Sequence, residues 1–315
     1  MKSLPLGKTG LMTSPIVFGG NVFGWTADEP LSYRLLDQMV EAGLNTIDTA
    51  DVYSRWADGN SGGESETVIG NWLAANPGKR DSVVLITKVG SDMGGEGEKG
   101  LKAAWIEKAV ENSLSRLKTD VIDLYLSHWP DEDTSDEETL TAFDALLKAG
   151  KVRAIGTSNR DRAQMERAAK AAADAGLPRY DVLQPEYNLH ARGTFEGPLA
   201  DYCIDNDIGV ITYFSLASGF LSGKYRSQDD VSGERARMVG KYLDDRGMRI
   251  LAALDAIAAD TGATQAEIAL AWLRQKPGVT APIASATKPA QLDSLIKAAT
   301  LDLSDEAMAA LDATL

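Results

Sequence analysis

The feature that most constrains the fold is a regular alternation of short β-branched segments with longer amphipathic segments. Eight segments have the composition of buried strands. They cover residues 16–18, 45–48, 83–87, 122–126, 152–155, 182–184, 210–213 and 279–283. Helix-like segments separate most of them, at residues 31–41, 64–75, 102–117, 136–148, 161–173 and 197–206, with two more in succession after residue 245. This order predicts an α/β protein.

Strands that alternate with helices imply a parallel sheet with right-handed crossovers. Eight such units in 315 residues favour a closed (β/α)8 TIM barrel, with an open doubly wound sheet as the competing architecture. Two short apolar segments around a glycine-rich turn predict an N-terminal β-hairpin within residues 1–13. Two extra helices follow from Lys288, and Ser304 is the expected N-cap of the second. No linker or repeat interrupts residues 1–315, so we expect one domain.

Composition narrows the class of function. Lys and Arg total 32 against 46 Asp and Glu, and the net charge of −14 argues against a nucleic-acid partner. One cysteine, Cys203, excludes an intrachain disulfide and a thiolate metal cluster, and with two histidines we expect no metal site. The first residues lack the apolar core of a signal peptide, and no segment approaches the ~20 apolar residues of a membrane span. A cytoplasmic protein without a membrane partner is expected, while its oligomeric state stays open.

Four polar side chains of different chemistry follow the predicted strands. Asp48 ends the second strand and Tyr53 follows five residues later, while Lys88 and His128 end the third and fourth strands. In a closed barrel the carboxyl ends of the strands converge on one mouth, where the chemistry takes place. An acid, a phenol, an amine and an imidazole are therefore expected to share a small volume.

This set of groups suits the reduction of a carbonyl. A free tyrosine has a pKa near ~10, and a nearby ammonium is expected to lower it by favouring the phenolate. A carboxylate beside the lysine holds it charged, and an imidazole can orient a carbonyl oxygen. The tyrosine would then act as general acid in reduction and as general base in the reverse direction. No side chain donates hydride, so this chemistry requires a nicotinamide.

Ordered motifs along nearly the whole chain resemble the aldo-keto reductase family. They are Leu6 to Leu11 (LGKTGL), Asp48 to Tyr53 (DTADVY), Thr87-Lys88, His128 to Pro130 (HWP), Ile155 to Asn159 (IGTSN), Gln184 to Asn188 (QPEYN), Tyr213 through Tyr225 and Lys288 to Leu292 (KPAQL). The resemblance implies that Asp48, Tyr53, Lys88 and His128 form the catalytic tetrad. It also implies reduction of aldehydes and ketones, or oxidation of sugars and alcohols, usually with NADPH and without a metal.

The resemblance also implies a cofactor site. Ser158, Asn159 and Gln184 match the residues that hold the nicotinamide carboxamide, and Tyr213 matches the aromatic residue that stacks on the ring. Ser215, Leu216, Gly219 and Leu221 match the loop around the pyrophosphate, and Ser285, Ala286, Thr287, Lys288 and Gln291 match the adenosine end. Many relatives carry an arginine that grips the 2′-phosphate, but Gln291 stands at that position here. We expect NADPH, with Lys288 as the replacement cation, while NADH stays possible.

Several alternatives stay open at this stage. Asp48 and Lys88 could form a purely structural ion pair. Trp25, Trp56 and Trp129 follow strand ends, where they could wall an apolar substrate pocket or pack under loops. The long segments 90–101 and 216–245 are expected to be loops, and part of the second could close over the cofactor. Besides an enzyme, the chain could be a nicotinamide-binding redox-sensor module with little turnover, or a barrel isomerase or aldolase with a Schiff base on Lys88.

Overall fold

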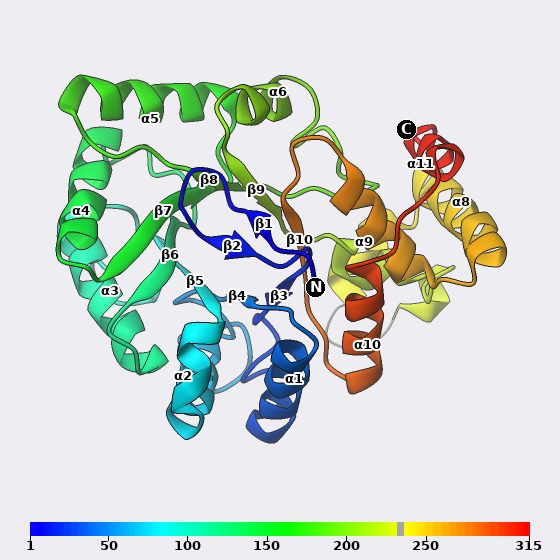
Figure 1. Ribbon diagram of the computed structural model, residues 1–315, viewed down its shortest axis with the longest axis horizontal. Coiled ribbons are helices and arrows are strands. Elements are labelled where there is room, and N and C mark those ends of the chain that lie inside the picture. The colour runs from blue at the N-terminus through cyan, green and yellow to red at the C-terminus, as the bar shows by residue number, and fades with distance from the viewer. Residues whose placement is uncertain (232–235) are drawn as a thin grey trace.

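The strands close into a single barrel, as Figure 1 shows. The computed structural model describes residues 1–231 and 236–315. Eight parallel strands form the barrel in the order β10-β3-β4-β5-β6-β7-β8-β9. They are β3 (Val17–Gly19), β4 (Thr46–Asp48), β5 (Val84–Val89), β6 (Ile122–Ser127), β7 (Val152–Ser158), β8 (Val182–Gln184), β9 (Gly209–Thr212) and β10 (Ala281–Ala284). The predicted (β/α)8 barrel is confirmed, and the open doubly wound sheet is excluded.

Helices pack around the outside of the strands. They are α1 (Glu29–Glu41), α2 (Glu64–Ala75), α3 (Ala103–Leu117), α4 (Asp136–Lys148), α5 (Arg162–Ala175), α6 (Pro198–Asp205), α8 (Asp245–Thr261), α9 (Gln265–Gln275), α10 (Pro289–Ala298) and α11 (Asp305–Asp312). The predicted N-cap of α11 is confirmed, because the side chain of Ser304 accepts from the backbone N–H of Ala307. Of the residues that the structure describes, none belongs to a helix long and apolar enough to cross a membrane.

The N-terminal hairpin seals one end of the barrel. Strands β1 (Leu4–Pro5) and β2 (Met12–Thr13) pair antiparallel, as predicted. Leu6, fully buried, packs with the side chains that fill the barrel interior. Gly7 has φ +57°, and a Cβ there would lie 2.3 Å from the carbonyl oxygen of Asp181, just before β8. The hairpin therefore covers the amino ends of the strands and leaves the carboxyl ends open.

The segment expected to be a long loop, residues 216–245, differs from that expectation. It contains short helical turns, because local i to i+3 hydrogen bonds organise it. Within this segment they are η2 (Ala217–Ser222), η3 (Gln228–Asp230), α7 (Ala236–Val239) and η4 (Gly240–Tyr242). One further 3-10 helix, η1 (Pro77–Ser82), lies between α2 and β5. The part at residues 232–235 lies outside the described residues. The other long segment, residues 90–101, contains neither helix nor strand, as predicted.

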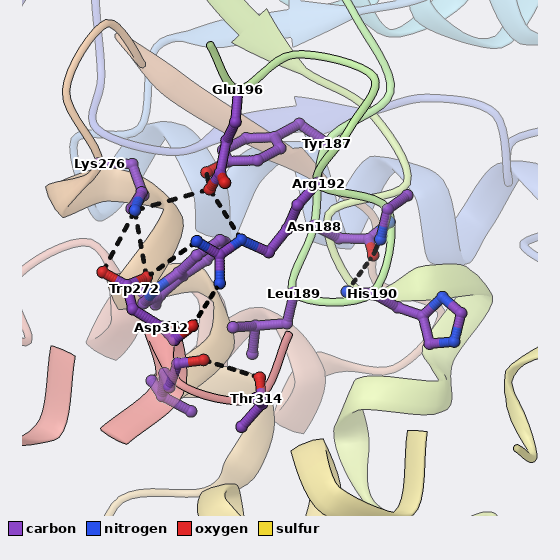
Figure 2. A network of polar contacts seen from close by, with 12 residues as sticks. Tyr187, Asn188, Leu189, His190, Arg192, Glu196, Trp272, Lys276, Asp312 and Thr314 are labelled. Carbon is purple, nitrogen blue, oxygen red and sulfur yellow. Dashed lines mark hydrogen bonds and ion pairs between the residues drawn. The ribbon is translucent and has the colours of Figure 1, made fainter. Parts of the chain in front are cut away.

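A network of polar contacts around the buried Arg192 fastens the C-terminal helix to the barrel, as Figure 2 shows. Arg192, 5% exposed in the segment after β8, donates from Nη1 to the carbonyl oxygen of Asp312 at 2.9 Å. Its Nε donates to Glu196 at 2.8 Å. Lys276 pairs with the Asp312 carboxylate at 3.1 Å, and Trp272 Nε1 donates to the same carboxylate at 2.9 Å. These contacts hold α11 against α9 without reaching the four residues of the predicted tetrad.

Candidate active site

The barrel brings the four predicted catalytic residues together at the carboxyl ends of neighbouring strands. Asp48 is the last residue of β4, and Tyr53 lies in the turn that follows. Lys88 lies within β5 rather than at its end, because that strand continues to Val89. His128 is the first residue after β6. Asp48 and His128, 80 positions apart in sequence, thus belong to one cluster of side chains, as expected from the convergence of the carboxyl ends of the strands.

Lys88 is at the centre of this group. Its ammonium donates to Asp48 Oδ2, to the carbonyl oxygen of Thr49 and to the phenol oxygen of Tyr53, each at 2.8 Å. Lys88 is fully buried and Asp48 is 1% exposed. An ammonium has three N–H bonds, so these three contacts use all of them. This geometry disfavours Lys88 as a Schiff-base nucleophile, and the bond to Tyr53 goes beyond a purely structural ion pair.

Burial and charge set the protonation of these groups. Burial, followed by the charge of Asp48, raises the pKa of Tyr53 well above its usual value. The expectation that Lys88 lowers this pKa is therefore not met, because desolvation of the phenolate outweighs the ammonium. Burial also lowers the pKa of Lys88, against the opposing effect of Asp48. Tyr53 is accordingly a protonated phenol at neutral pH, which is the form a proton donor needs.

His128 lies beside the phenol in neutral form. The ring centroids of Tyr53 and His128 are 5.9 Å apart. Burial, followed by the charge of Lys88, lowers the pKa of His128 well below its usual value. Ser91 Oγ lies 3.0 Å from His128 Nδ1. A neutral imidazole held on one nitrogen leaves Nε2 as the atom that could contact a carbonyl oxygen.

The residues expected near a nicotinamide form one network with the tetrad. Gln184, the last residue of β8, donates from Nε2 to Asp48 Oδ1 at 2.8 Å. Ser158 donates to the carbonyl oxygen of Gln184 at 2.7 Å, and Asn159 donates to the carbonyl oxygen of His128 at 2.9 Å. The phenol of Tyr213 donates to Asn159 Oδ1 at 2.6 Å. The structure therefore brings all four next to the tetrad.

The remaining cofactor candidates lie in two segments. Ser215, Leu216, Gly219 and Leu221 lie in the turns that follow β9, where Ala217, Ser218 and Gly219 all have positive φ. The hydroxyl of Ser218 is buried next to the phenol of Tyr242. At the other segment, Ser285 donates to Asn21 Oδ1 at 2.6 Å, and Gln291 accepts from the backbone N–H of Thr287 at 2.7 Å. Lys288, at the start of α10, is exposed, and Ala286 is buried.

The three tryptophans expected near the substrate lie beside the tetrad. The Trp56 ring is 5.9 Å from Tyr53 and 5.7 Å from Trp25, and the Trp129 ring stacks on His128 at 5.8 Å. Trp56 and Trp129 are each 50% exposed. Exposed aromatic rings beside Tyr53 and His128 favour the interpretation that these tryptophans wall a substrate pocket over the alternative that they pack under loops.

Sequence reasoning missed two residues that support this site. Asn21 follows β3 and binds Ser285, and Ser91 follows β5 and binds His128. The rule that chemistry follows the carboxyl ends of strands could have found both, since Asn21 comes two residues after β3 and Ser91 two after β5. His190, to which we assign no role from the sequence, has its Nε2 3.2 Å from Asp244 Oδ1.

Comparison with known proteins agrees with this geometry. Residues 15–315 match the aldo/keto reductase family. The chain is 34% identical over 94% of its length to the aldo-keto reductase YhdN of Bacillus subtilis (strain 168), covering 88% of that protein. It is 33% identical over 96% of its length to an uncharacterized oxidoreductase, YrpG, of the same organism, covering 92% of it. It is 32% identical over 93% of its length to a probable voltage-gated potassium channel subunit beta of Arabidopsis thaliana, covering 89% of it.

The closed parallel barrel, the polar residues at the carboxyl ends of its strands and the family match together indicate a nicotinamide-dependent oxidoreductase. The chain belongs to the aldo/keto reductase family. Membership implies NAD(P)H-dependent reduction of small carbonyl compounds.

Proposed function

We propose that the chain, residues 1–315 acting as one cytoplasmic unit, interconverts a carbonyl compound and an alcohol with Tyr53 as general acid and base. One observation carries the proposal: the Lys88 ammonium lies 2.8 Å from both the Tyr53 phenol and the Asp48 carboxylate. The proposed proton donor, Tyr53, is therefore hydrogen-bonded to the buried Lys88–Asp48 ion pair at the barrel mouth. The rings of Tyr53 and His128 are in edge contact, with centroids 5.9 Å apart, so both side chains are candidates to contact one carbonyl oxygen.

In reduction, a substrate carbonyl accepts hydride at carbon and a proton at oxygen. The nicotinamide supplies the hydride when it is bound. Tyr53 donates its phenol proton to the oxygen, and Lys88 stabilises the phenolate that remains, because its ammonium already lies at hydrogen-bond distance. Asp48 holds Lys88 in place, and neutral His128 orients the carbonyl. In the reverse direction the phenolate takes the alcohol proton.

The chain's residues fit a nicotinamide dinucleotide. Ser158, Asn159 and Gln184 offer hydroxyl and amide groups beside Asp48, as a carboxamide requires. The buried hydroxyl of Ser218 is a group that a ligand oxygen can contact in the 215–221 segment. We assign the adenosine end to Ser285, Thr287, Lys288 and Gln291, with Lys288 as the cation for a 2′-phosphate. NADPH is therefore the proposed cofactor.

The proposed substrate is a small carbonyl compound with an apolar part. Trp25, Trp56 and Trp129 offer aromatic surface next to Tyr53 and His128. Aromatic faces with few polar groups favour an apolar substituent on the carbonyl.

Titration of NADPH and of NADH, followed by quenching of tryptophan fluorescence, tests the proposal together with turnover on a panel of aldehydes. We expect saturable binding, tighter for NADPH, and oxidation of the cofactor that depends on the aldehyde. Absence of binding for both nucleotides would refute the proposal.

A second candidate function, a redox-sensor module, is favoured by the similarity to proteins named potassium channel beta subunits. A sensor would bind the nucleotide with little steady-state turnover. The same experiment separates the two candidates: tight binding without aldehyde-dependent oxidation supports the sensor.

A further inference from the structure

A cavity of about 250 Å3 lies outside the barrel against α3. Segments after β4 and after β5 form its other walls, and its polar lining consists of Asp51, Ser61, Glu98, Trp105, Asn112 and Arg116. None of the tetrad residues lines it. The cavity adjoins the active site through the backbone, because the N–H of Asp51 donates to the carbonyl oxygen of Lys88 at 3.2 Å.

Two buried polar groups in this wall have no side-chain partner. Asp51 is 1% exposed, and neither of its carboxyl oxygens has a side-chain hydrogen-bond partner among residues 1–231 and 236–315. Trp105 is 6% exposed, and its indole N–H has no acceptor within the same part of the chain. Buried polar groups are almost always hydrogen-bonded, so a carboxyl without a side-chain partner and an unpaired indole N–H on one cavity favour a ligand that completes them.

The charges around the cavity are already balanced. Arg116 pairs with Glu66 at 2.6 Å, and Glu98 pairs with Lys108 at 2.8 Å. Burial, followed by the charge of Glu66, raises the pKa of Asp51 well above its usual value. A protonated carboxyl both donates and accepts a hydrogen bond, whereas the indole N–H only donates. A cation would leave the indole unsatisfied, and an anion would face the Glu98 carboxylate in the cavity wall.

We propose that this cavity binds a compact neutral polyol, whose hydroxyl groups accept from the Trp105 indole and exchange hydrogen bonds with Asp51. Hydroxyls fit because each one is both a donor and an acceptor. The volume equals that of roughly eight liquid waters, which suits a polyol of about four to six carbons. This site is separate from the active site, so it does not depend on the proposed reaction.

The test uses 15N-labelled full-length protein and xylitol as the probe. Trp105→Phe assigns the indole resonance of Trp105, and the titration follows that resonance together with those of Trp25, Trp56 and Trp129. We expect a saturable shift at Trp105, with no saturation at the three tryptophans of the barrel mouth over the same range. No saturable shift at Trp105, or saturation at the mouth alone, would overturn the proposal.

Two pairs of variants sharpen the test. Asp51→Asn keeps a donor and an acceptor and should leave xylitol affinity within about threefold, while Asp51→Leu should weaken it about tenfold or more. Asn112→Phe narrows the cavity from a partly exposed position and should abolish the shift, whereas the exposed Glu107→Gln should not. The other indole resonances report whether each variant is folded. Retention of the shift in folded Asn112→Phe, or a response to methylammonium or acetate in place of xylitol, would contradict the assignment.

Discussion

Gln184 Nε2 donates to Asp48 Oδ1 at 2.8 Å, so a residue expected to hold the cofactor also holds the carboxylate of the tetrad. The other oxygen of Asp48 accepts from Lys88 at 2.8 Å. Both carboxylate oxygens are thereby engaged inside a buried site. Residues 136 positions apart in sequence are thus in contact, and this contact joins the residue expected to bind the cofactor with the proposed tetrad.

Replacement of Gln184 by Leu removes that contact. One oxygen of a buried carboxylate loses its partner, which costs about 1–3 kcal/mol, so we expect kcat/KM to fall roughly 5- to 150-fold. Steady-state kinetics measures this, with the partly exposed Gln38→Leu on α1 as the control. An unchanged kcat/KM in Gln184→Leu would show that the contact has no part in turnover.

Tyr53→Phe removes the proposed proton donor and keeps the ring. We expect carbonyl reduction to fall about 100-fold or more while nucleotide affinity stays nearly unchanged. Aldehyde-dependent cofactor oxidation and fluorescence titration measure the two quantities. Near-normal reduction by this variant would disprove the assignment of Tyr53.

The expected pH dependence of kcat/KM follows from the shifted pKa values of Tyr53 and His128. The pKa of Tyr53 is raised, so the phenol stays protonated through neutral pH, and reduction should persist there and fall only in alkali. Oxidation of the alcohol needs the phenolate and should rise with pH. The pKa of His128 is lowered, so the imidazole stays neutral near pH ~6.5 and should give no inflection there. Profiles of kcat/KM in both directions check this, and an inflection near ~6.5 that His128→Gln removes would contradict it.

Lys288→Met tests the proposed contact with a 2′-phosphate. Loss of one charged contact should weaken NADPH binding about tenfold and leave NADH binding nearly unchanged. The matched control is Lys297→Met, an exposed lysine in the last turn of the same helix, α10. Titration of both nucleotides measures the effect, and equal weakening for the two would argue against a phosphate contact.

Arg192→Ala tests the network that fastens α11. The variant leaves Glu196 and the last turn of α11 without their buried donor, so the free energy of unfolding should drop by about 2 kcal/mol. Urea denaturation measures the loss. Arg162→Ala removes an exposed pair with Glu166 and should cost at most about 0.5 kcal/mol. Equal losses in the two variants would mean that the network adds nothing beyond a surface pair.

Much of the architecture could be predicted because it follows from local patterns. The spacing of β-branched segments located the eight strands, and closure of the barrel then follows from the connections between them. The segment 216–245 was mispredicted as a loop because 3-10 turns are short and have no apolar periodicity. Asn21 and Ser91 were missed because their role depends on partners elsewhere in the chain.

The sequence by itself favoured the barrel and predicted the end at which Asp48, Tyr53, Lys88 and His128 gather, because the strands and the residues that end them can be recognised from local patterns. Only the tertiary structure decided the protonation states of these four side chains and the hydrogen bonds between them. The rise in the pKa of Tyr53 depends on desolvation, and desolvation depends on every segment that packs around the phenol. In the same way, the contact of Gln184 with Asp48 exists only once distant strands are side by side.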